Sequence, residues 1–120
     1  MAKKVKIGDL FVVPLTDGQL ALGKVLWRGK KAYFRGDLQV GIYKRVTTGE
    51  VNGASTQGAK PLSLFYLIVG ALERPLRPGW RVIGHEKLAA HERGLTRRIH
   101  GGAVYFEDEY LGRATAKDYR

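Results

Sequence analysis

The sequence contains no cysteine among its 120 residues. This absence excludes a disulfide framework, a thiolate zinc site and a cysteine nucleophile, and it fits a reducing compartment. Proline is scarce, with four residues against sixteen glycines, which is typical of many turns between short elements. Because no apolar run approaches membrane-spanning length and the N-terminal residues do not resemble a secretory signal, we expect a soluble, cytoplasmic protein with no membrane partner.

Acidic residues are few relative to basic ones. The chain has 11 Asp and Glu against 21 Lys and Arg, a formal charge of +10. A balance of this kind indicates nucleic acid, an anionic membrane or an acidic protein as the partner. The excess lies mainly in residues 1–72, which hold eleven basic and four acidic side chains.

The distribution of apolar runs and turn residues along the sequence predicts mainly short strands. Apolar runs at 10–15 and 20–27 flank an Asp-Gly dipeptide that favours a tight hairpin turn. Both faces of the second run are apolar, so we expect it to be covered on both sides. The most hydrophobic run, residues 62–70, is interpreted as a central strand that carries the core.

The length predicts a single domain over residues 1–120, and residues 85–120 are either part of its body or a C-terminal arm. In that segment a short helix or an irregular arm precedes a last strand or hairpin. In total we expect five to seven short strands and one or two short helices. The predicted fold class is mainly β, as a strongly bent antiparallel sheet or a small, partly open barrel.

Arrangements that would carry catalysis or bind a metal fail on spacing. His85 and His91 are six residues apart, whereas the zinc-peptidase helix places its two histidines four apart. The stretch at 53–61 departs from a phosphate loop, because an extra alanine precedes its lysine and a proline replaces the hydroxyl residue. Ser55 and Ser63 lack the residues of a nucleophile elbow. We therefore predict no catalytic residue, no metal, no cofactor and no enzyme activity.

A basic stretch interleaved with aromatic residues is the first candidate binding surface. Its aromatic members are Trp27, Tyr33, Phe34 and Tyr43, and Asp37 is its single acid. The seven basic candidates are Lys24, Arg28, Lys30, Lys31, Arg35, Lys44 and Arg45.

Three interpretations of this stretch remain open. Cations that attract phosphate beside rings that stack on bases are the combination found in binders of single-stranded nucleic acid. The same cations can also dock an acidic protein surface. Alternatively, the rings belong to the core and the lysines only confer solubility.

Two motifs resemble a known family. The opening, Lys6-Ile7-Gly8-Asp9 with Phe11 and Val13-Pro14-Leu15, is followed by Asp17-Gly18 and by Gly23-Lys24-Val25-Leu26, and it is similar to the start of the bacterial Imm26-like immunity proteins. Later, Trp80-Arg81-Val82-Ile83-Gly84 resembles the tryptophan-to-glycine signature of that family. The family residues carried over, which look like turn and core positions, are Gly8, Asp9, Phe11, Pro14, Gly18, Gly23, Trp80 and Gly84.

This resemblance implies a mainly β immunity protein of a polymorphic toxin or contact-dependent inhibition system. It would bind and neutralise a cognate toxin domain one-to-one, by docking and without catalysis. An inhibitor of a nucleic-acid-degrading toxin is expected to be acidic, so the positive charge of this chain leaves two alternatives. Either the toxin presents an acidic surface, or contact uses the acidic patch Glu107, Asp108 and Glu109. A basic barrel that binds RNA or single-stranded DNA is the alternative function, and an enzyme similar to the RNA-cleaving toxins, whose small barrels share the Gly-Asp opening, is the third.

Overall fold

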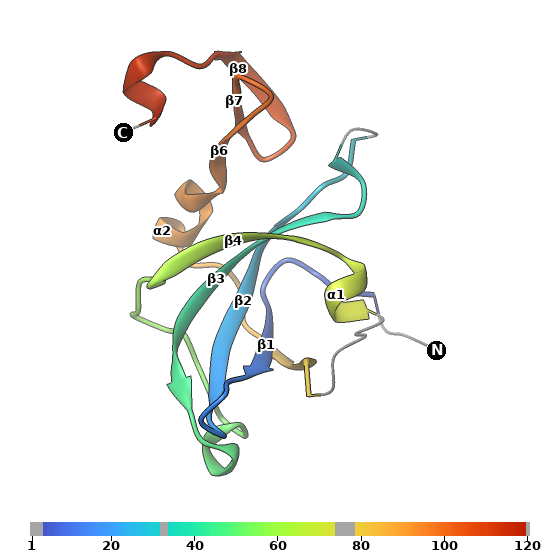
Figure 1. Cartoon of the computed structure of the whole chain (residues 1–120), viewed down its shortest axis with the longest axis vertical. Coiled ribbons are helices and arrows are strands. Elements are labelled where there is room, and N and C mark those ends of the chain that lie inside the picture. Colours follow the sequence, from blue (N-terminus) through green and yellow to red (C-terminus); the bar gives the residue numbers. More distant parts are fainter. Residues whose placement is uncertain (1–3, 32–33, 74–78, 120) are drawn as a thin grey trace.

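The computed structural model describes residues 4–31, 34–73 and 79–119, and its strands form two antiparallel sheets (Figure 1). The five-stranded sheet has the order β4-β3-β2-β1-β5, with β1 at Asp9–Pro14, β2 at Leu20–Arg28, β3 at Asp37–Val46, β4 at Ser63–Ile68 and β5 at Arg81–His85. The three-stranded sheet has the order β6-β7-β8, with β6 at Arg97–His100, β7 at Ala103–Phe106 and β8 at Glu109–Arg113.

Helices are short in the described residues. The α-helices are α1 at Gly70–Glu73 and α2 at Ala90–Arg93, and the 3₁₀ turns are η2 at Thr48–Glu50, η3 at Gly94–Thr96 and η4 at Ala116–Tyr119. The predicted mainly β class is confirmed, as a bent sheet that does not close into a barrel, because β4 and β5 are its two edges. No described helix combines the length and the apolar character needed to cross a membrane.

The first hairpin confirms the turn predicted from the Asp-Gly dipeptide. Gly18 has φ of +85°, and the Asp17 carboxylate accepts the N–H of Gln19 at 3.0 Å, which stabilises the turn. Beyond it, β2 pairs with β1 on one side and β3 on the other. The prediction that β2 is covered on both sides is also confirmed, because every residue from Leu20 to Trp27 is buried.

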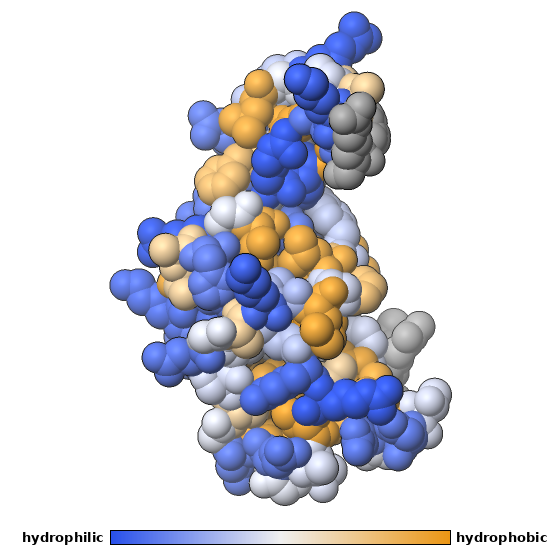
Figure 2. Space-filling view, turned by 90° about the vertical axis from the view of Figure 1, so that its left-hand side faces the viewer, coloured by the Kyte–Doolittle hydropathy of each residue, from blue (hydrophilic) through white to orange (hydrophobic). Residues whose placement is uncertain are grey.

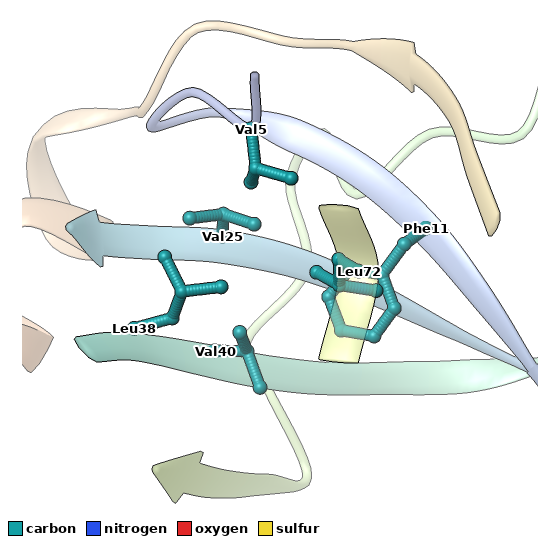
Figure 3. Packing of buried hydrophobic residues seen from close by; sticks show 6 residues of the cluster. All are labelled: Val5, Phe11, Val25, Leu38, Val40 and Leu72. Atoms are coloured by element: carbon teal, nitrogen blue, oxygen red, sulfur yellow. The ribbon is translucent and has the colours of Figure 1, made fainter. Parts of the chain in front are cut away.

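Two apolar clusters cover the opposite faces of this central hairpin. The first, in which side chains of β1, β2, β3 and α1 point toward one another (Figure 3), contains Val5, Phe11, Val25, Leu38, Val40 and Leu72. The second contains Leu10, Val12, Leu20, Leu22 and Val46. Alternation along β1 explains the division, since successive residues of a strand face opposite sides of the sheet.

The interpretation of residues 62–70 as the central, core-bearing strand was wrong. Strand β4 lies at the edge of the five-stranded sheet, and most of its side chains are exposed. Hydrophobicity alone predicted burial, but the order of the strands places β1 and β2 in the interior instead.

After β5 ends at His85, the described part of the segment 85–120 forms helix α2, the 3₁₀ turns η3 and η4 and the three-stranded sheet. This sheet packs against the end of β2. The Arg98 guanidinium lies 3.8 Å from the centroid of the Trp27 ring, and Phe34 meets Tyr105 edge to face at 5.0 Å. The Gln39 side chain also donates to the carbonyl of Leu95. The expected last strand or hairpin is therefore a sheet of three strands docked on the aromatic end of the first sheet.

Candidate partner-binding surfaces

The seven basic candidates do not share one surface. Lys24 is buried within β2, at 1% exposure, whereas the other six lie at two ends of the β2–β3 hairpin. Arg35 precedes β3 and Lys44 comes near its end, so the rise of a strand separates them by roughly 25–30 Å. The candidates thus divide into a near group around Arg28 to Arg35 and a far pair, Lys44 and Arg45.

The near group borders a groove that we call the basic groove. It has a volume of about 680 Å³, and its lining consists of Lys4, Val5, Lys6, Ile7, Arg28, Gly29, Lys30 and Arg35. Five of these eight side chains are cationic. Arg28 is held by an ion pair with Glu73 and by donation to the carbonyl of Val5. Among the described residues, the other four cations make no ion pair.

Sequence reasoning left Lys4 and Lys6 out of this surface. The residues 3–6 read Lys-Lys-Val-Lys, so the signal was present, but Lys6 lies eighteen residues before Lys24, the first member of the basic stretch in β2 and β3. The chain segment before β1 passes beside the end of β2, because Val5 packs in the first core cluster and Gly8 donates its N–H to the carbonyl of Val25.

The far pair has a different setting at the other end of the hairpin. Arg45 forms an ion pair with Asp17 of the first turn, and Lys44 is exposed beside it. The main-chain N–H of Gln19, and then the Arg45 guanidinium, hold the pKa of Asp17 below its ordinary value. Arg45 therefore contributes to the turn as well as to the surface.

The acidic patch lies at the turn between β7 and β8, and its three residues have different settings. Glu107 and Glu109 are exposed. Asp108 accepts the N–H groups of Lys30 and Lys31, at 2.7 and 2.8 Å, and the indole N–H of Trp27 at 3.0 Å. Burial opposes ionisation of this carboxyl, but the three donors outweigh it and lower its pKa. Asp108 thus anchors the second sheet to the first.

The two candidate patches adjoin each other. Lys30 and Lys31 line a hollow of about 300 Å³ together with Phe106, Glu107, Asp108 and Glu109. A partner that contacts one patch therefore meets the charges of the other. This proximity could not be read from the sequence, because some 78 residues separate Lys30 from Asp108.

The aromatic residues of the basic stretch are occupied inside the protein. Trp27, Phe34 and Tyr43 are all buried, the first two beneath Arg98 and the second sheet. Tyr33 lies outside the described residues. These three rings are consequently not available to stack on the bases of a nucleic acid in this structure.

Lys24 of β2 belongs to a buried ionic network. The Lys24 ammonium lies 2.9 Å from Glu92 Oε1, and it donates to Thr56 Oγ1 and to the carbonyl of Lys87. Tyr43 donates its hydroxyl to Glu92 Oε2 at 2.5 Å. Burial raises the pKa of Tyr43, and the Glu92 carboxylate raises it further. Lys24 therefore ties the segment after β5 to the sheet instead of contacting solvent.

An exposed apolar strand is the surface that sequence reasoning missed. Strand β4 and the residue before it present Leu62, Leu64, Phe65, Tyr66 and Ile68 to solvent. Beside Phe65 lies an apolar hollow of about 330 Å³ whose floor includes Phe11, Val40 and Trp80. Orange patches on the face drawn in Figure 2 show that apolar side chains reach the surface of this protein.

The histidines considered for a metal site have other contacts. His85 Nδ1 lies 2.9 Å from Asp9 Oδ1, and His91 Nε2 lies 3.0 Å from the carbonyl of Ala59. Within the described ranges, no three His, Asp or Glu side chains gather as a metal-ligating group.

The residues that carry the family resemblance occupy turns and packing positions. Gly8 has φ of +97°, and a Cβ there would lie 2.8 Å from the carbonyl oxygen of Glu86. The ring of Phe11 covers Gly23, where a Cβ would lie 2.3 Å from it. The remaining members are Asp9, which accepts the N–H of Lys6, Pro14 at the end of β1, Gly18 in the first turn, Trp80 against the first core cluster and Gly84 opposite Leu10.

Comparison with known families identifies the family of this chain. Residues 6–100 match the model of the family described as Immunity protein 26, a range that includes the whole five-stranded sheet and ends with β6. No curated protein and no solved structure matches the chain.

Proposed function

This chain belongs to the Immunity protein 26 family, and we propose that it neutralises a cognate toxin of a polymorphic or contact-dependent system by docking, without catalysis, as a one-to-one complex in the cytoplasm. The match confirms the resemblance inferred from the opening and tryptophan motifs. An immunity protein implies a toxin as partner, and a complex that covers the active site of the toxin inhibits it without any catalysis by the immunity protein.

The basic groove is the observation that supports a specific contact surface. Lys4, Lys6, Lys30 and Arg35 are exposed cations without an ion pair among the described residues, so their charge is available to a partner. Opposite potentials accelerate encounter and select the partner. We therefore propose that the groove receives an acidic surface of the toxin, with Lys31 and the acidic patch at its border.

Co-purification with the product of the adjacent gene tests the function. We expect a stable one-to-one complex and protection of cells that express the toxin. Absence of a complex together with absence of protection would refute the proposed function.

Charge reversal tests the surface separately. Lys30→Glu with Arg35→Glu should slow association and weaken the complex by about tenfold or more, most strongly at low salt. Lys44→Glu with Lys60→Glu is the matched control, because it changes the net charge equally at exposed positions outside the groove. If both double variants bind equally well, the basic groove is not the contact surface, even where the immunity function stands.

The basic groove also favours a second candidate, binding of RNA or single-stranded DNA. Burial of Trp27, Phe34 and Tyr43 removes the rings that such a site uses for stacking, so the toxin is the better-supported partner. The test is titration of a labelled single-stranded RNA at several salt concentrations. Affinity that falls steeply with salt and is lost on reversal of Lys30 and Arg35 would favour nucleic acid.

A further inference from the structure

Strand β4 is an edge strand with apolar side chains on both faces. Leu64, Tyr66 and Ile68 are 41%, 43% and 67% exposed on one face, and Phe65 is 51% exposed beside the apolar hollow on the other. Edge strands of soluble proteins usually carry charges, prolines or bulges that prevent pairing with another strand. Strand β4 carries none of these, and its pairing with β3 is regular over its whole length.

The outer edge of β4 offers backbone groups for a further strand. Val69 donates its N–H to the carbonyl of Gly36 at 2.7 Å, which fixes the phase of the ladder between β3 and β4. Backbone groups of an antiparallel strand alternate in direction, so residues 63, 65, 67 and 69 face β3. Those of Leu64, Tyr66 and Ile68 face outward, and no described strand pairs with them.

Charge separates this edge from the rest of the surface. Residues 61–72 contain no charged side chain, although the chain as a whole carries +10. Two copies of a strongly basic protein repel each other wherever their charged faces meet. A strand without charged side chains lowers that cost. The Asp37 carboxylate, which accepts the Tyr66 hydroxyl at 2.7 Å, is an acidic group beside this strand and opposes the net positive charge.

We propose that a second copy of this chain pairs with β4 in antiparallel fashion, making one continuous sheet across a two-fold axis. When the two-fold axis passes at Tyr66, each outward-facing residue of β4 pairs with an outward-facing residue of β4 in the other copy. Tyr66 then lies opposite Tyr66, and Leu64 lies opposite Ile68. Three such pairs exchange about six backbone hydrogen bonds. The contact is isologous, because the same edge serves both copies.

A second copy fits this edge better than the toxin does. Homodimer interfaces are more apolar than the interfaces of partners that meet as separate folded proteins. An edge without charge also gives no electrostatic steering toward an acidic surface, which the basic groove supplies. Because the two surfaces differ, self-association and toxin binding can be measured independently.

The mass of the full chain in solution tests the proposal. Sedimentation or light scattering should give twice the chain mass of 13.4 kDa at high concentration, and dissociation on dilution. The double variant Leu64→Lys with Ile68→Lys sets like charges opposite each other across the axis. It should raise the dissociation constant about a hundredfold or more while leaving the circular dichroism spectrum unchanged, since both side chains are exposed.

Two further variants make the test specific. Tyr110→Lys with Leu111→Lys adds the same charge at exposed positions of β8 and should leave the dimer intact. Leu64→Lys with Ile68→Glu places a lysine opposite a glutamate in the proposed register and should restore the dimer. A monomeric wild-type chain at millimolar concentration would overturn the proposal. A dimer that is unaffected by Leu64→Lys with Ile68→Lys would also overturn it. If the wild-type chain is monomeric and this double variant loses toxin binding, the edge belongs to the toxin interface instead.

Discussion

Replacing Lys24 tests whether the buried ionic network holds the segment after β5 on the sheet. The side chains of Lys24 and Glu92 are 1% and 2% exposed, with 2.9 Å between the ammonium and the carboxylate. Lys24→Met keeps most of the stem volume but leaves the Glu92 charge buried without its cation. Removal of one member of a buried pair costs roughly 3–5 kcal/mol.

This loss is a large fraction of the total stability of such a domain, which is about 5–15 kcal/mol. For a chain of this length it corresponds to a decrease in Tm of roughly 10–20 °C. Thermal and urea unfolding followed by circular dichroism measure both quantities.

A double-mutant cycle isolates the contribution of the pair. Glu92→Gln alone should also destabilise, because Lys24 then lacks its close counter-charge, whereas the double variant should lose less than the sum of the two. Arg45→Met is the control, since it removes an exposed ion pair with Asp17 and should change the midpoint little. A decrease of less than about 1 kcal/mol in the free energy of unfolding for Lys24→Met would refute the reasoning, because a buried carboxylate without its counter-charge destabilises the folded state by more than that.

Three other predictions concern stability. Burial opposes ionisation of Glu92, but its hydrogen bonds and the neighbouring ammonium lower its pKa below 4.5 in the folded protein. The ionised carboxylate therefore contributes fully to the free energy of unfolding above pH 4.5, and this contribution is lost as the pH falls through the pKa of the folded state. Unfolding measured from about pH 7 to pH 3 should show this decline. Asp108→Ala removes the acceptor that joins the two sheets, and limited proteolysis should then cleave the C-terminal sheet earlier than in the wild type, whereas an unchanged cleavage rate would contradict the anchoring role. Gly23→Ala sets a methyl group against the buried ring of Phe11 and should lower the free energy of unfolding in urea by about 1–3 kcal/mol; Gly70→Ala should be nearly neutral, because its added Cβ would have no atom within 4 Å beyond its chain neighbours and its own helix backbone.

Much of the local structure could be predicted from sequence because short-range signals determine it. The Asp17-Gly18 turn, the two-sided burial of Leu20 to Trp27 and the mainly β class follow from turn chemistry and the period of two. The opening and tryptophan motifs also indicated the family that the match over residues 6–100 confirms.

The candidate surfaces were less predictable, because a lysine in a strand looks the same in sequence whether it is buried or exposed. Lys24 was assigned to the binding face, yet its counter-charge Glu92 lies 68 residues away and removes it from solvent. Likewise Asp108 was one of three similar acids until its contacts with Trp27 and Lys30 distinguished it.

The sequence by itself determined the turns, the strand periodicity, the excess of positive charge and the family, because each depends on neighbouring residues or on composition. Only the tertiary structure decided that the most hydrophobic run is an exposed edge, that Lys4 and Lys6 join Lys30 and Arg35 around one groove, and that Lys24 is internal. These outcomes depend on the order of the strands in the sheet and on contacts between residues far apart in the chain, and no local pattern encodes either.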